Sequence, residues 1–145
     1  ETSVGKIAPL ICYDQWYPEA ARIATLLGAE ILIYPTAIGL IDEHVEENIT
    51  GDWEQMWRQA QVGHACVNNV YVAAVNRVGK EGAITFWGGS FVAGPAGHLI
   101  VKGSAKEEIL FAECDLQRVR ALQHAWRFLP NRRPEVYSPL TRPQS

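Results

Sequence analysis

The sequence lacks an apolar run approaching the roughly 20 residues that a membrane-spanning helix needs. Its first residues also lack the basic and apolar regions of a signal peptide. No large excess of either charge is present, because 13 basic and 16 acidic residues leave a net charge of −3. This near balance argues against nucleic acid and against an anionic membrane as the main partner.

Cysteine is scarce as well. The three cysteines, Cys12, Cys66 and Cys114, cannot all pair, and none stands in C-x-x-C spacing. This excludes a disulfide framework and favours a reducing, cytoplasmic setting. The isolated His64-Ala65-Cys66 is weak evidence for a metal, since metal sites usually need a second pair of ligands. We therefore predict no metal, and a core position for His64.

The order of elements predicts an α/β fold. A length of 145 residues with 48% hydrophobic content fits one globular domain with a real core. A buried strand over 4–12, a helix from Pro18 to Gly28 and a strand over 30–35 form a βαβ unit, which favours a parallel sheet. A connection over 36–51 precedes a helix that Asp52 caps. Then follow a strand over 70–75, a strand meander over 84–94, 99–102 and 109–114, and a helix from Leu116 to Trp126.

Apolar spacing also predicts which helix faces are buried. In the first helix the apolar face is Ala20, Ile23, Ala24 and Leu27. In the second it is Trp53, Met56, Trp57, Ala60, His64 and Val67.

Cys12 ends the first predicted strand, just before a sharp turn into a helix. This position favours a reactive thiolate, because a helix N-terminus and nearby N–H groups stabilise negative charge on sulfur. The same turn aims N–H groups, beginning with that of Tyr13, at the place where an oxyanion would form. Position alone leaves an inert buried cysteine as the more common case. The neighbouring residues decide between the two.

Residues 11–22 (ICYDQWYPEAAR) resemble the nucleophile segment of the nitrilase superfamily. The resemblance continues over essentially the whole chain, in ordered blocks that include 34–39 (YPTAIG), 75–79 (VNRVG) and 94–97 (GPAG). It implies an α-β-β-α sandwich, a Glu–Lys–Cys triad with Cys12 as the nucleophile, and neither a metal nor an organic cofactor. The tail with Arg132, Arg133 and Tyr137 resembles one used for subunit packing, which implies a homo-oligomer.

The resemblance also implies that two triad members are missing from these residues. In the family the Glu and Lys precede the cysteine, whereas only eleven residues precede Cys12, and Lys6 among them does not match the family's lysine. We therefore expect residues 1–145 to be the carboxy-terminal half of one carbon–nitrogen hydrolase domain. Alone they should not turn over substrate, because the base and the charge stabiliser are absent.

The substrate implied is a small carbamoyl amine or amide. Family members that act on acidic substrates place arginine where this chain has Gln15 and Trp16, so a neutral or cationic tail is favoured. We expect these two residues to contact substrate, together with Ala37, Ile38 and an acidic residue, Asp42 or Glu43. The alternative for the acidic residues is a solvated face, since four carboxylates fall within 42–47.

Several functions stay open at this point. Within the enzyme class the alternatives are an aliphatic amidase, a carbamoyl amino acid hydrolase and a nitrilase. Outside the enzyme class, the alternative is a non-catalytic half domain that serves as an oligomer module. Ser90 is not expected to be a nucleophile, because no G-x-S-x-G and no acid–base partners accompany it.

Overall fold

The predicted βαβ unit begins the fold in the computed structural model, which describes residues 2–41 and 52–143. Strand β1 (Ile7–Pro9), helix α1 (Pro18–Leu26) and strand β2 (Ile31–Thr36) follow one another, and β1 pairs with β2 in parallel. β1 is an edge strand of the main sheet, where the missing N–H of Pro9 is tolerated. This arrangement confirms the predicted α/β start of the chain.

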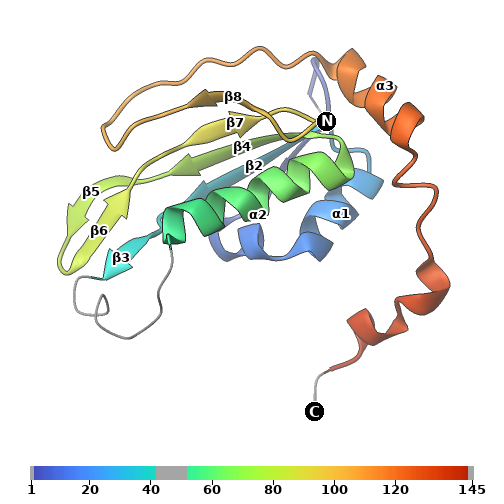
Figure 1. The fold of residues 1–145 in the computed structure, drawn as a ribbon, viewed down its shortest axis with the longest axis horizontal. Helices are drawn as coiled ribbons and strands as arrows, with labels where there is room; N and C mark the ends of the chain where they lie inside the picture. Colours follow the sequence, from blue (N-terminus) through green and yellow to red (C-terminus); the bar gives the residue numbers. More distant parts are fainter. Residues whose placement is uncertain (1, 42–51, 144–145) are drawn as a thin grey trace.

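The main sheet has the order β1-β2-β4-β7-β8 (Figure 1). β4 (Tyr71–Asn76) pairs with β2 in parallel, β7 (Phe91–Ala93) pairs with β4 antiparallel, and β8 (Leu99–Lys102) pairs with β7 antiparallel. The turn between β7 and β8 is closed by a 2.8 Å hydrogen bond from the Gly97 N–H to the Gly94 carbonyl. The sheet is therefore mixed rather than parallel throughout.

A second, small sheet divides one predicted strand into two. It has the order β3-β6-β5 and contains β3 (Gly39–Ile41), β5 (Val78–Glu81) and β6 (Ile84–Trp87). The predicted strand over 84–94 is therefore two strands in different sheets. They separate at Gly88, whose φ is +64° and where a Cβ would lie 2.7 Å from the Ser104 carbonyl oxygen. Residues 109–114 form no strand.

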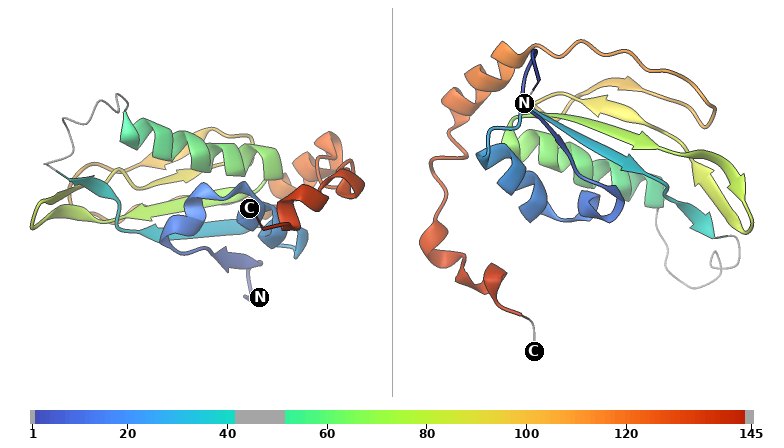
Figure 2. Two further views of the ribbon diagram at one scale, coloured as in Figure 1. Left: turned by 90° about the horizontal axis from the view of Figure 1, so that it is seen from below. Right: turned by 180° about the vertical axis from the view of Figure 1, so that it is seen from behind.

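Helices α1 and α2 (Trp53–Asn68) pack against one face of the main sheet (Figure 2). The Asp52 side chain accepts the Gln55 N–H at 2.8 Å, so the predicted cap is confirmed. The predicted faces are partly wrong. In α1 the buried residues are Ala21 and Thr25, while Ile23 is 57% exposed. The buried residues of α2 are Trp57, Gln61, His64, Ala65 and Asn68.

The chain ends with α3 (Leu116–Trp126) and a tail that extends away from the sheets (Figure 1). The tail contains two single turns, η3 (Pro134–Val136) and η4 (Ser138–Thr141). Among the described residues, no helix has the length and hydropathy needed to cross a membrane.

Candidate active site around Cys12

The backbone of Cys12 adopts a conformation that is rare for its residue type. Its φ is +53°, in the left-handed region, and it begins the short helix η1 (Cys12–Trp16). Asp14 closes this turn, because its Oδ2 accepts the Ile11 N–H at 3.0 Å and its own N–H donates to the Ile11 carbonyl at 3.2 Å. Such strain costs about 1–3 kcal/mol and persists where surrounding contacts impose it, often at functional sites. The Cys12 residue is exposed.

One side-chain hydroxyl contacts the Cys12 sulfur. Thr36 Oγ1 donates a hydrogen bond to Cys12 Sγ at 3.6 Å, within the range for a sulfur acceptor. Thr36 ends β2, and Cys12 follows the neighbouring parallel strand β1. Both residues therefore lie at the carboxyl ends of adjacent parallel strands, which is where α/β folds place their sites.

Gln15 lies beneath Thr36 rather than at the surface. It is 1% exposed, its Nε2 donates to Thr36 Oγ1 at 3.3 Å, and its Oε1 accepts the Trp57 indole N–H at 2.7 Å. The side chain thus offers no accessible atom to a ligand, which corrects the expected substrate contact. Trp16 is partly buried and packs against the core, so only part of its ring is available.

His64 holds the backbone of Gln15. Its Nε2 lies 2.9 Å from the Gln15 carbonyl oxygen, and the side chain is 5% exposed. Burial lowers the pKa of His64, so the neutral ring donates through Nε2. The predicted core position of His64 is confirmed. Within residues 2–41 and 52–143, no three His, Cys, Asp or Glu side chains gather as metal ligands would.

The expected pocket residues Ala37 and Ile38 follow Thr36 directly. Ala37 is exposed and Ile38 is partly buried. Asn76, at the end of β4, holds this segment: its Oδ1 accepts the Ile38 N–H at 2.9 Å, and its Nδ2 donates to the carbonyls of Ile38 and Gly88, each at 3.0 Å. The Ser90 hydroxyl is also occupied, because it accepts the Asn76 N–H at 2.9 Å.

The remaining predicted site residues are less constrained by contacts. The Tyr13 ring is 67% exposed and meets the Tyr17 ring edge-on at 5.9 Å. Its N–H stands in the first turn of η1, where amides have no acceptor within the helix. A role in binding an oxyanion stays a prediction. Asp42 and Glu43 lie outside the described residues.

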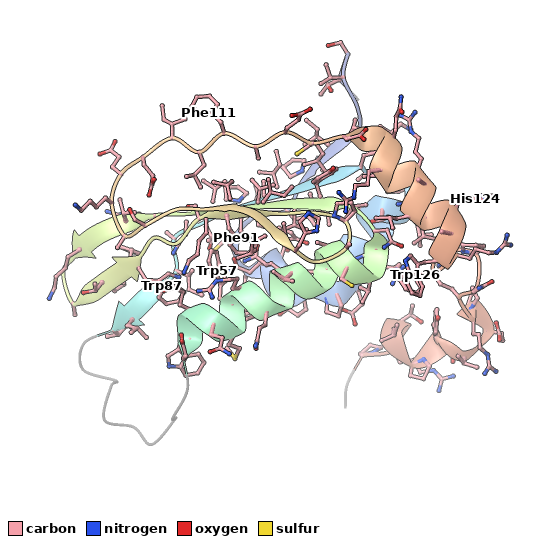
Figure 3. The ribbon with its side chains drawn as sticks, turned by 45° about the horizontal axis from the view of Figure 1, so that its top comes forward. Trp57, Trp87, Phe91, Phe111, His124 and Trp126 are labelled. Atoms are coloured by element: carbon pink, nitrogen blue, oxygen red, sulfur yellow. The ribbon has the colours of Figure 1, made fainter. Side chains whose placement is uncertain are left out.

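Sequence reasoning missed the side chains that support Cys12. Thr36 and Asp14 belong to the quoted motif blocks, so a signal for them was present. Trp57 and Gln15 are 42 residues apart, and no local pattern predicts that they meet. In the structure Trp57 lies between α2 and the sheet, edge-on to Phe91 at 5.4 Å and to Trp87 at 6.1 Å (Figure 3).

Comparison with known proteins gives consistent matches. The carbon-nitrogen hydrolase family model matches residues 1–124. The N-carbamoylputrescine amidase of Solanum tuberosum is 43% identical over 149 residues, covering 97% of this chain and 48% of that protein. The citrullinase of Francisella tularensis is 36% identical, covering 98% and 50%. The crystal structure of a carbon-nitrogen hydrolase from Helicobacter pylori G27 is 47% identical with a TM-score of 0.92, covering 99% and 52%. The chain thus spans about half the length of these relatives.

Proposed function

The chain belongs to the carbon–nitrogen hydrolase family, and from this premise we propose that it forms the Cys12-bearing half of a hydrolase domain that cleaves a non-peptide C–N bond. The observation that carries the proposal is the geometry of Cys12. An exposed thiol sits in a left-handed turn after a parallel strand, with a hydroxyl donor on its sulfur. A sharp strand-to-helix turn that presents a nucleophile is a recurrent device for acyl transfer.

The proposed reaction has two steps. A glutamate takes the Cys12 proton, and the thiolate attacks the carbonyl carbon of a carbamoyl or amide group. A lysine ammonium and the Tyr13 N–H stabilise the oxyanion. The C–N bond then breaks, and the leaving nitrogen takes the proton from the glutamate. Water hydrolyses the acylated cysteine and regenerates the thiol. For a carbamoyl amine the products are the amine, carbon dioxide and ammonia.

The glutamate and the lysine of this scheme come from an amino-terminal half that these residues do not include. We propose further that the complete protein is a cytoplasmic homo-oligomer that uses neither a metal nor an organic cofactor. Exposed apolar residues on α1 and directly after it support self-association, because Ile23 is 57% and Leu27 is 76% exposed.

The proposed substrate is N-carbamoylputrescine or a similar carbamoyl amine. Similarity to the amidase of Solanum tuberosum supports it, and so does Trp16, whose partly exposed ring suits an alkyl or cationic chain better than a carboxylate. Similarity to a citrullinase favours a carbamoyl amino acid as the main alternative. An aliphatic amide and a nitrile remain further alternatives, as does a half domain with no catalytic activity.

Ammonia release tests the reaction class. The full-length reading frame is expressed and offered a panel of carbamoyl amines, carbamoyl amino acids, amides and nitriles. We expect release from carbamoyl amines, and a loss of about 10³-fold or more in the Cys12→Ser variant, because removal of a nucleophile removes covalent catalysis. The matched control is Cys66→Ser, which changes another exposed cysteine on α2 and should retain activity. Activity that survives in Cys12→Ser would refute the proposal.

Specificity is tested at Trp16. Trp16→Arg should shift the ratio of kcat/KM from carbamoyl amines toward carbamoyl amino acids by about tenfold or more, because a guanidinium binds a carboxylate and repels an ammonium. Trp126→Arg places the same charge on a tryptophan of α3 that is 61% exposed and serves as the control. An unchanged ratio in Trp16→Arg would remove this residue from the substrate site.

A further inference from the structure

A chain of three hydrogen bonds connects the buried face of α2 to the Cys12 sulfur. The Trp57 indole N–H donates to Gln15 Oε1 at 2.7 Å, and Gln15 Nε2 donates to Thr36 Oγ1 at 3.3 Å. The Thr36 hydroxyl then donates to Cys12 Sγ at 3.6 Å. The reaction scheme above uses only Cys12 from this chain of four residues.

The donor at one end fixes the direction of every bond. An indole N–H donates and has no acceptor, so the amide of Gln15 must turn its oxygen toward Trp57. Its NH₂ group therefore faces Thr36, and the hydroxyl oxygen of Thr36 acts as the acceptor. A hydroxyl has one proton, and among the described residues the structure directs that proton at the Cys12 sulfur.

The surroundings keep this direction from changing. Trp57 is 0% exposed and packs edge-on against the Phe91 ring, so its indole has no room to turn. Gln15 is 1% exposed, and His64 holds its backbone carbonyl at 2.9 Å. The Trp57–Gln15 bond is buried, so water screens it little, whereas the Gln15–Thr36 bond is partly buried and the Thr36–Cys12 bond is exposed.

We propose that Thr36 is a catalytic residue that stabilises the Cys12 thiolate through its hydroxyl proton, and that Gln15 and Trp57 are positioning residues that aim this proton at the sulfur. A hydrogen bond donated to the charged form of a group favours that form. The proposal rests on the proposed function only in taking Cys12 as the nucleophile. It assigns the thiolate a stabilising group within this chain, separate from the glutamate that takes the proton.

The test measures the thiolate directly, without substrate. The full-length protein is alkylated with iodoacetamide over a series of pH values, and the rate at Cys12 is followed by mass spectrometry of its peptide. Thr36→Val should move the midpoint of the rate profile to higher pH by about one unit, and Thr36→Ser should return it to the original value. Cys66, exposed on α2, is the internal control in every digest and should not change.

A double-mutant cycle tests the positioning residues. Gln15→Met keeps the length of the side chain, removes both of its hydrogen bonds and frees the Thr36 hydroxyl to turn. The midpoint should rise by less than in Thr36→Val, and Gln15→Met should add nothing in the Thr36→Val background. An unchanged midpoint in Thr36→Val overturns the role of Thr36, and equal effects of Gln15→Met in both backgrounds overturn action through Thr36.

These readouts separate the two proposals. If the full-length protein releases no ammonia but the Thr36→Val shift is present, the proposed function fails and the hydrogen-bond chain stands. If ammonia is released and the shift is absent, the proposed function stands and the hydrogen-bond chain fails.

Discussion

Two regions of the molecule differ in which side chains they bury and which they expose. Around Cys12, polar groups such as Gln15 and His64 are almost completely buried, and each makes a hydrogen bond inside the core. In the outer segment, which we define as residues 105–114, large apolar side chains face outward: Ile109 is 81% and Phe111 is 86% exposed. Figure 3 shows Phe111 on this segment, apart from the labelled core residues Trp57 and Phe91.

The contrast shows which interactions the described residues complete among themselves. Buried polar groups are costly unless they are paired, and Gln15 and His64 near Cys12 are paired within this chain. Exposed apolar groups in quantity indicate a surface that another part of a protein covers. We therefore expect the arrangement beside Cys12 to form from these residues, and the outer segment to be covered in the complete domain proposed above.

The largest expected effect compares two tryptophans. Trp57→Ala removes a side chain that is 0% exposed and should lower the free energy of unfolding by about 3–5 kcal/mol, because the cavity adds to the lost burial. Trp126→Ala changes a side chain that is 61% exposed and should cost at most about 1 kcal/mol. Urea unfolding of the full-length protein followed by circular dichroism measures both. Equal losses of unfolding free energy in the two variants would contradict the expected difference between buried and exposed tryptophans.

The α2 helix shows what sequence could predict and where it stopped. Its existence, its start at Asp52 and its length follow from the cap and from helical spacing. The buried face does not, since hydropathy selects Met56 and Val67, which are 43% and 45% exposed. The core instead buries Gln61 and Asn68, whose amides donate to backbone carbonyls one turn earlier. The oxygens of both side chains have no partner among the described residues, so hydrogen bonds compensate this burial only in part, and hydropathy does not measure them.

The outer segment shows the opposite error. Ile109, Leu110, Phe111 and Ala112 form a short continuous apolar run, which predicts a strand. A strand also needs a neighbour to pair with, and β8 pairs with β7 while residues 109–114 pair with no described strand. By contrast, the motif around Cys12 identified the candidate nucleophile, because a long ordered resemblance carries information that a short apolar run lacks. The partners of Cys12 in the structure come from distant strands and helices.

A smaller effect is expected at two asparagines. Asn76→Ala removes a buried amide that holds the Ile38 segment and leaves the Ile38 and Gly88 backbone groups unpaired, so it should cost about 1–3 kcal/mol. Asn131→Ala changes an exposed residue of the tail and should stay within about 0.5 kcal/mol. The same urea titration measures both variants. A cost below about 0.5 kcal/mol for Asn76→Ala would mean that the segment does not depend on this amide.

A buried and an exposed histidine are expected to differ in how they affect stability as the pH changes. Burial lowers the pKa of His64 below 6.5, an effect that its hydrogen bond to Gln15 and the charge of Glu19 offset only in part. Below about pH 6.5 the unfolded chain therefore binds more protons than the folded chain. The free energy of unfolding decreases as the pH is lowered, by up to about 1.4 kcal/mol per pH unit. His64→Gln should flatten this slope, whereas His124→Gln, at an exposed position on α3, should leave it unchanged. A slope that survives in His64→Gln would assign it to other groups.

The smallest effect on stability is expected in the outer segment itself. Phe111→Ser removes a ring that is 86% exposed, so the free energy of unfolding of residues 1–145 should change by less than about 0.5 kcal/mol. Self-association should decrease, because exposed apolar surface promotes it; sedimentation at several concentrations measures this change. In the full-length protein the same substitution should cost 1 kcal/mol or more, since we expect the ring to be covered there, at about 25 cal/mol per Å² of buried apolar surface. An equally small effect in both chains would show that the outer segment stays uncovered in the complete domain.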